Sequence, residues 1–326
     1  MKPSDKRRIW FAAPALLCGL SLAAACCPCA ISMAEEPTYT IQLFHPRQLD
    51  DLQRVHVVVN QTLEDIVKKG EHEQSHKTQK RRIEFTASYD VLEIDKAGLP
   101  TRLNCTVEKA TAKVDPGALL ELVKPNSILD VEIKDGKPII QPASDLVKLA
   151  PEAQPLLGML IMLSTAANES RLESMVGTSQ PQKLKGTWPI KTAAVAKELA
   201  DFDPQLKEKA VTGTGELTAV TKSSGKDVLE VSYTFRARSA MAVGGAPGGD
   251  MTPMGATLET TGKIEVPPDH STGPISQKVK VVTERKYLKK PGERDRDKTP
   301  QDEIMRATDA ADIHVDYLQR GIPIKK

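Results

Sequence analysis

Apolar and polar residues alternate with a period of two along most of the chain after Tyr39, which is the pattern of strands that bury one face. In the first half, this alternation predicts strands over residues 39–44, 55–66, 83–91, 103–107, 128–133 and 138–140. Two of the turns between them contain a glycine that can adopt a positive φ, at Gly98 and in Asp135-Gly136. The first half therefore predicts antiparallel hairpins.

The middle of the chain changes to helical spacing. Residues 143–167 predict one or two short helices, because Pro151 and Pro155 interrupt the first half of this stretch. Residues 191–202 predict another helix, since their apolar positions recur every three or four residues. Strands resume at Val211.

The second half resembles the first in design. Residues 217–233 look like a repeat of the hairpin over 91–107, and further strands are predicted over 256–266, 275–287 and 311–317. Residues 240–255 are rich in Gly, Met and Pro and predict a surface loop. Residues 289–301 are rich in charge and predict a solvated linker.

These elements predict an α+β fold that is mostly antiparallel β, with two similar curved β-sheet lobes joined by a short helical segment. The expected division is a signal peptide over residues 1–34, an N-terminal β-lobe over 35–142, a helical connector over 143–204, a C-terminal β-lobe over 205–288, and a charged linker and tail over 289–326.

The first segment has the layout of a secretory signal, in which basic residues precede an apolar stretch from Ile9 to Ala25. Small residues at the end of the segment predict cleavage after Ala34. The alternative is lipid attachment at Cys26, although Ala23 stands where such sites prefer Leu. No later run reaches the roughly 18 apolar residues of a membrane span. We therefore expect an exported protein, periplasmic or secreted, without a transmembrane span after signal removal.

Removal of the signal changes the charge balance. The whole chain has 45 basic and 43 acidic residues, and residues 1–34 contain four basic residues and one acidic residue. The mature chain would then have 41 basic and 42 acidic residues, a net charge of −1. A nearly neutral chain lacks the basic excess that nucleic-acid binding requires, so we expect no nucleic-acid partner.

Only Cys105 would remain after cleavage, so no intramolecular disulfide is expected. Cys105 shares one face of a predicted strand with Leu103 and Val107. This position predicts a buried core thiol rather than a nucleophile.

The segment His72-Glu73-Gln74-Ser75-His76 has the H-E-x-x-H spacing of zinc hydrolases. On a helix, His72 and His76 would face one zinc ion and Glu73 would serve as a general base. The flanking residues, Gly70 before and the basic run Lys77–Arg82 after, instead predict the exposed end of a hairpin. A zinc-dependent hydrolase is therefore the alternative function, and no metal or other cofactor is expected.

A second unusual feature is the apolar run from Leu156 to Leu163, which is too apolar on all sides for a surface helix. One interpretation is a helix that fills the space between two curved sheets. The other is a wall of a cavity for an apolar ligand, with two methionines as adaptable contacts. The candidate ligand-binding residues are Leu156, Met159, Leu160, Met162 and Leu163.

The signal, the segment YDVLEIDKAGLPTRLNCTVEKA (residues 89–110) and the segment KGTWPIKTAAVAKEL (residues 185–199) resemble a family of exported bacterial β-rich proteins that is a domain of unknown function. That family has no established catalytic residues, so the resemblance assigns none here. The inferred shape also resembles periplasmic lipoprotein carriers, which have a half-barrel with an apolar lining.

We therefore predict an exported protein of the cell envelope that is not an enzyme and that acts as a binding or structural module. The expected partners are an apolar small molecule or another envelope protein. No sequence feature indicates an oligomeric state.

Overall fold

The structure is a computed structural model, and it describes residues 36–134, 136–144, 148–200, 203–223, 226–239, 251–289 and 301–318. The predicted signal and the alternative lipid-attachment site Cys26 lie outside the described residues. So do Asp135 of the predicted turn, most of the predicted loop over 240–255 and the interior of the predicted linker over 289–301.

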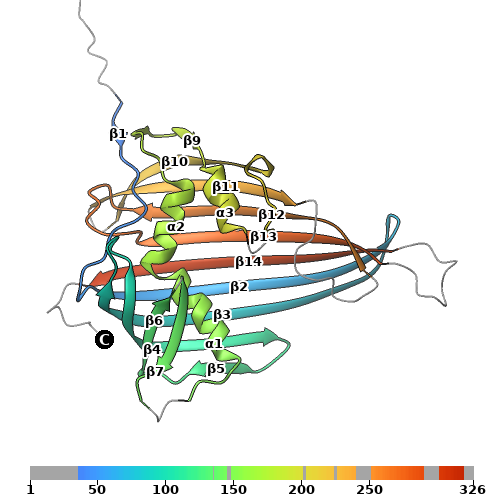
Figure 1. Cartoon of the computed structure of the whole chain (residues 1–326), viewed down its shortest axis with the longest axis horizontal. Coiled ribbons are helices and arrows are strands. Elements are labelled where there is room, and N and C mark those ends of the chain that lie inside the picture. The colour runs from blue at the N-terminus through green and yellow to red at the C-terminus, as the bar shows by residue number, and fades with distance from the viewer. Residues whose placement is uncertain are drawn as a thin grey trace, which may run out of the picture. The chain divides into compact units, whose positions relative to one another are not determined.

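Twelve of the described strands form one antiparallel sheet, in the order β7-β6-β4-β3-β2-β14-β13-β12-β11-β10-β9, with β5 paired to β4 (Figure 1). The strands of its first half are β2 (Leu52–Lys69), β3 (His72–Ile94), β4 (Pro100–Asp115), β5 (Leu119–Val123), β6 (Ser127–Lys134) and β7 (Lys137–Pro142). The others are β9 (Thr187–Pro189), β10 (Val211–Ser223), β11 (Lys226–Ser239), β12 (Met251–Val266), β13 (Ser276–Lys289) and β14 (Gln301–Leu318). A separate small sheet pairs β1 (Thr38–Tyr39) with β8 (Gln182–Lys183).

The prediction of a mostly antiparallel β fold with few helices is confirmed, whereas the two-lobe arrangement is not. β14 lies in the middle of the large sheet, where it pairs with β2 on one side and β13 on the other. This central strand joins the strands of the first half to those of the second. The sequence predicted only its last residues, 311–317, because polar and charged side chains dominate the earlier ones.

Three helices cover one face of the sheet, as Figure 1 shows: α1 (Ala153–Leu163), α2 (Ala166–Val176) and α3 (Thr192–Glu198). α1 and α3 fall within the two stretches for which helices were predicted, whereas α2 begins at the end of the first stretch and continues beyond it to Val176. Pro155 is in the first turn of α1, where the missing N–H has no intrahelical partner to lose. None of the helices that the structure describes combines the length and apolar character needed to span a bilayer.

The helix-bearing face contains two apolar clusters. One joins α1 to β2, β3, β4 and β6, and the other joins α2 and α3 to β10, β11 and β12. Cys105 is a fully buried member of the first cluster, and burial raises the pKa of its thiol, as expected of a core residue. The opposite face is largely polar, which is the usual division of an antiparallel sheet with one solvated side.

Several central strands continue beyond the helices, as the far ends of β2, β3 and β14 show in Figure 1. Every residue of β3 from His72 to Lys80 is exposed. The alternation that predicts strands depends on a difference between the two faces. Because both faces meet solvent here, the first part of β3 has no alternation, and the sequence predicted this strand only over 83–91.

Candidate ligand-binding site

A pocket of about 480 Å³ lies on the helix-bearing face, beyond the helices, where β3, β2, β14 and β13 run side by side. Leu63 and Asp65 point to this face because they have the same parity along β2 as Val59, which is buried in the core. Met305 and Arg285 belong to the same face through the strand register. The pocket is thus an uncovered extension of the apolar core face.

The register places Asp65, Met305 and Arg285 in one row across three strands, since Met305 pairs with both of the others. Directly opposite side chains in such a row have Cβ atoms about 4.5–5.5 Å apart. The thioether of Met305 therefore stands between a carboxylate and a guanidinium group. Leu63 lies two residues before Asp65 and lines the same pocket.

The apolar side chains of this pocket are open to solvent. Leu63 is 48% exposed and Met305 is 36% exposed. Complete burial of such a side chain is worth about 1.5–3 kcal/mol, so both would gain from a ligand that covers them. Met305 can also adjust its shape, because its side chain is unbranched.

The polar groups of the pocket are incompletely satisfied. Asp65 Oδ1 and Arg285 Nε are buried atoms without a hydrogen-bond partner in the described part of the chain. Buried polar atoms are nearly always paired, and exceptions are concentrated at places with a function or an unfilled contact. Two polar groups that flank an apolar centre are the lining expected of a site for a small amphipathic molecule.

A second pocket of about 480 Å³ lies farther across the same face, against the beginning of α1. Its lining is mainly apolar and includes Val114, Leu120 and Leu156. Arg81 lines this second pocket, and Gln79, two residues earlier on β3, lines the first. β3 therefore connects the two pockets along one face of the sheet.

The five ligand-binding residues predicted from the apolar run differ in whether they are buried or line a pocket. Leu160 is fully buried, and Met159 and Leu163 pack against the first core cluster. Met162 is half-buried, and among the five candidates only Leu156 lines one of the two pockets described above. α1 is thus chiefly a packed helix that contributes one residue to the ligand-accessible surface.

The zinc-hydrolase alternative requires a helix at His72 and His76, and the structure has strand β3 there. Residues four apart on a strand are separated by roughly 13 Å, too far for two imidazoles to bind one zinc ion at about 2 Å each. His76 instead contacts two carboxylates, at 3.1 Å from Glu64 and 3.6 Å from Glu73. The described residues contain no group of three or more His, Cys, Asp or Glu side chains that could hold a metal ion.

Comparisons with known proteins add little to this geometry. No protein-family model matches the chain. A search of the curated proteins finds no significant match.

Among solved structures, one of lipovitellin, titled for its lipid–protein interactions, is similar with a TM-score of 0.34 and 9% identity, over 86% of this chain and 26% of that one. The chain thus spans about a quarter of the lipovitellin chain that it matches. OpdQ of Pseudomonas aeruginosa is similar with a TM-score of 0.20 and 8% identity, over 82% of this chain and 98% of that one. Neither likeness is close enough to carry an argument about function.

Proposed function

We propose that this protein is an exported, non-enzymatic binding module of the cell envelope. Its ligand would be a small amphipathic molecule with an acyl or similar apolar chain, bound on the helix-bearing face of the sheet. The observation that carries the proposal is the exposure of Leu63 and Met305 in a pocket on the same face of the sheet as the apolar core. The resemblance to exported β-rich proteins of unknown function stays a prediction.

The two pockets together could accommodate such a ligand along one face of the sheet. Its polar end would lie near Asp65 and Arg285, and its apolar chain would run past Met305 toward Leu156. Each pocket has a volume of about 480 Å³, within the usual range of about 300–1,000 Å³ for small-molecule sites. Export rests on the sequence of residues 1–34, and the non-enzymatic role rests on the hairpin context of the H-E-x-x-H segment, which does not suit a zinc-binding helix.

Titration with a dansyl-labelled fatty acid tests this proposal. We expect saturable binding to the mature protein, and we expect Leu63→Ser and Met305→Ser each to raise the dissociation constant by about five- to tenfold, the effect of losing roughly 1–1.4 kcal/mol of apolar contact. The fluorescence increase of the dansyl group provides the measurement.

Leu119→Ser is the matched control, because Leu119 is 65% exposed but lines neither pocket. We expect its dissociation constant to equal that of the unchanged protein. A protein that does not bind the probe, or a control variant that loses as much affinity as the pocket variants, would refute the assignment of the site.

A further inference from the structure

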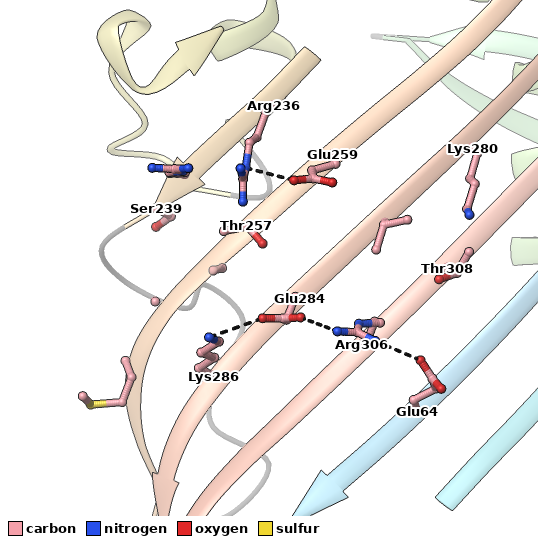
Figure 2. A pocket seen from close by; sticks show the side chains of 15 residues that line it. Glu64, Arg236, Ser239, Thr257, Glu259, Lys280, Glu284, Lys286, Arg306 and Thr308 are labelled. Atoms are coloured by element: carbon pink, nitrogen blue, oxygen red, sulfur yellow. Dashed lines mark hydrogen bonds and ion pairs between the residues drawn. The ribbon is translucent and has the colours of Figure 1, made fainter. Parts of the chain in front are cut away.

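The opposite face of the sheet has a hollow of about 630 Å³ in which charged side chains gather (Figure 2). Strand register places Arg238, Thr257, Glu284, Arg306 and Glu64 in one row across five strands. This row lies on the polar face, because Glu64 has the opposite parity along β2 from the buried Val59. The hollow therefore lies on the other face of the sheet from the proposed apolar site, although Glu64 and Arg306 line both.

Most of these charges are paired with one another, as the dashed lines in Figure 2 show. Arg306 lies 2.8 Å from Glu284 and 3.7 Å from Glu64, and Lys286 lies 3.5 Å from Glu284. The hydrogen bond from Arg306 is the main cause that holds the pKa of Glu284 below its usual range. Arg306 is thus held between two carboxylates and is not available for a ligand.

The same pairing occurs at the edge of the hollow, where Arg236 lies 3.0 Å from Glu259. Three carboxylates are then matched by three cations. Two further cations line the hollow, Arg238 and Lys280, and neither makes an ion pair or hydrogen bond with any residue that the structure describes. Five cations against three carboxylates give the lining a net charge of +2.

This surplus is local, because the mature chain is expected to have a net charge of −1. Both cations are exposed, and the hydroxyl-bearing side chains of Thr257 and Thr308 line the hollow with them. Positive side chains together with hydroxyl donors are the groups that bind oxyanions. An unpaired guanidinium is especially suited to phosphate, because it donates two parallel hydrogen bonds.

The spacing of the two cations restricts the ligand further. Arg238 and Lys280 are two strands apart and offset by four residues along the sheet, so their Cα atoms are separated by roughly 16 Å. A ligand with neighbouring oxyanions covers more of that distance than a single oxyanion does, so the two side chains need to bend less toward each other to contact it.

We propose that this hollow binds a ligand with two or more neighbouring phosphate-type oxyanions, contacted by Arg238 and Lys280. The shared chemistry fits a soluble oligophosphate and the phosphate headgroups of an anionic lipid surface. Neither Arg238 nor Lys280 lines the apolar pocket on the other face, so each site can exist without the other.

The test measures binding of inorganic tripolyphosphate by calorimetry and binding of phosphatidylcholine vesicles containing phosphatidylglycerol by sedimentation, both at low salt. The variant is Arg238→Gln with Lys280→Gln. The charge-matched control is Lys113→Gln with Lys124→Gln, two exposed lysines outside the hollow. Thermal unfolding of both variants confirms that they are folded.

We expect the hollow variant to bind the probe about tenfold more weakly, and the control variant to bind within about twofold of the unchanged protein. Binding of tripolyphosphate alone identifies a soluble oligophosphate ligand, and binding of vesicles alone identifies headgroups. If the unchanged protein binds neither probe, or if both variants lose affinity equally, the proposal is wrong. Because Leu63 and Met305 are untouched, fatty-acid binding by the hollow variant separates this outcome from failure of the proposed function.

Discussion

Replacement of Arg47 by Met is expected to lower the free energy of unfolding by about 3–5 kcal/mol, because it leaves the buried carboxylate of Glu169 without its partner. Arg47 is 3% exposed and Glu169 is 6% exposed, and an Nη2 hydrogen of Arg47 is donated to Oε1 of Glu169. Nη2 of Arg47 also lies 3.1 Å from the hydroxyl of Tyr317. This buried cluster ties the segment before β2 to α2 and to the end of β14.

The loss should depend on pH. Burial raises the pKa of Glu169, and Arg47 opposes that rise. In Arg47→Met the pKa of Glu169 rises further, so the folded state binds this proton more tightly than the unfolded state does. Protonation of Glu169 in the folded variant stabilises it fully at pH values below the pKa that Glu169 has in the unfolded chain. This stabilisation is lost as the pH rises through the higher pKa that Glu169 has in the folded variant. The deficit of the variant should therefore be larger at neutral pH than near about pH 4.5.

Urea unfolding at the two pH values measures both effects. The double variant Arg47→Met with Glu169→Gln is the control, because it removes the unpaired charge together with its partner. We expect it to recover a large part of the stability and to lose the pH dependence. A deficit below about 1 kcal/mol in the single variant, or an equal deficit at both pH values, would contradict this account of the cluster.

The second large effect is expected for Ile313→Pro in β14, which should lower the free energy of unfolding by at least about 4 kcal/mol. Ile313 is 2% exposed and pairs with Val57 on β2 and Gln277 on β13. Proline removes a hydrogen-bond donor from a strand with neighbours on both sides, and it leaves a space in the first core cluster. Proline is tolerated in strands at the edge of a sheet, as Pro138 is in the edge strand β7.

Ile313→Val separates the backbone effect from the loss of side-chain volume, and it should cost only about 0.5–1.5 kcal/mol. Denaturant unfolding of both variants gives the comparison. If β14 were a peripheral tail, the proline and valine variants would unfold at the same urea concentration. The central position of β14 predicts that they differ widely.

The sequence was sufficient to predict those strands that have one buried apolar face and one exposed polar face. The alternation of Val55, Val57 and Val59 predicted β2, and Gly98 and Gly136 have the positive φ that their turns require. The first half of β3 was not predicted, because both of its faces meet solvent and its residues are polar throughout. The single sheet was not predicted either, because a strand's own pattern says which face is buried and not which strands are its neighbours.

The residues of the candidate site likewise divide into one that the sequence could predict and two that it could not. Leu156 could be found from the sequence because it belongs to an apolar run. Leu63 and Met305 are 242 positions apart in the printed sequence, and only the register of β2 with β14 brings them to one pocket. An isolated apolar residue among polar neighbours is ordinary on a protein surface, so neither residue had a signal of its own.

Photoaffinity labelling with a diazirine-bearing fatty acid, followed by peptide mapping, tests the proposed ligand site most directly. The account predicts saturable labels on the peptides that contain Leu63 and Met305, with labels near Leu156 when the diazirine is at the far end of the acyl chain. Labels that do not saturate, or that occur only on residues of the polar face, would contradict it.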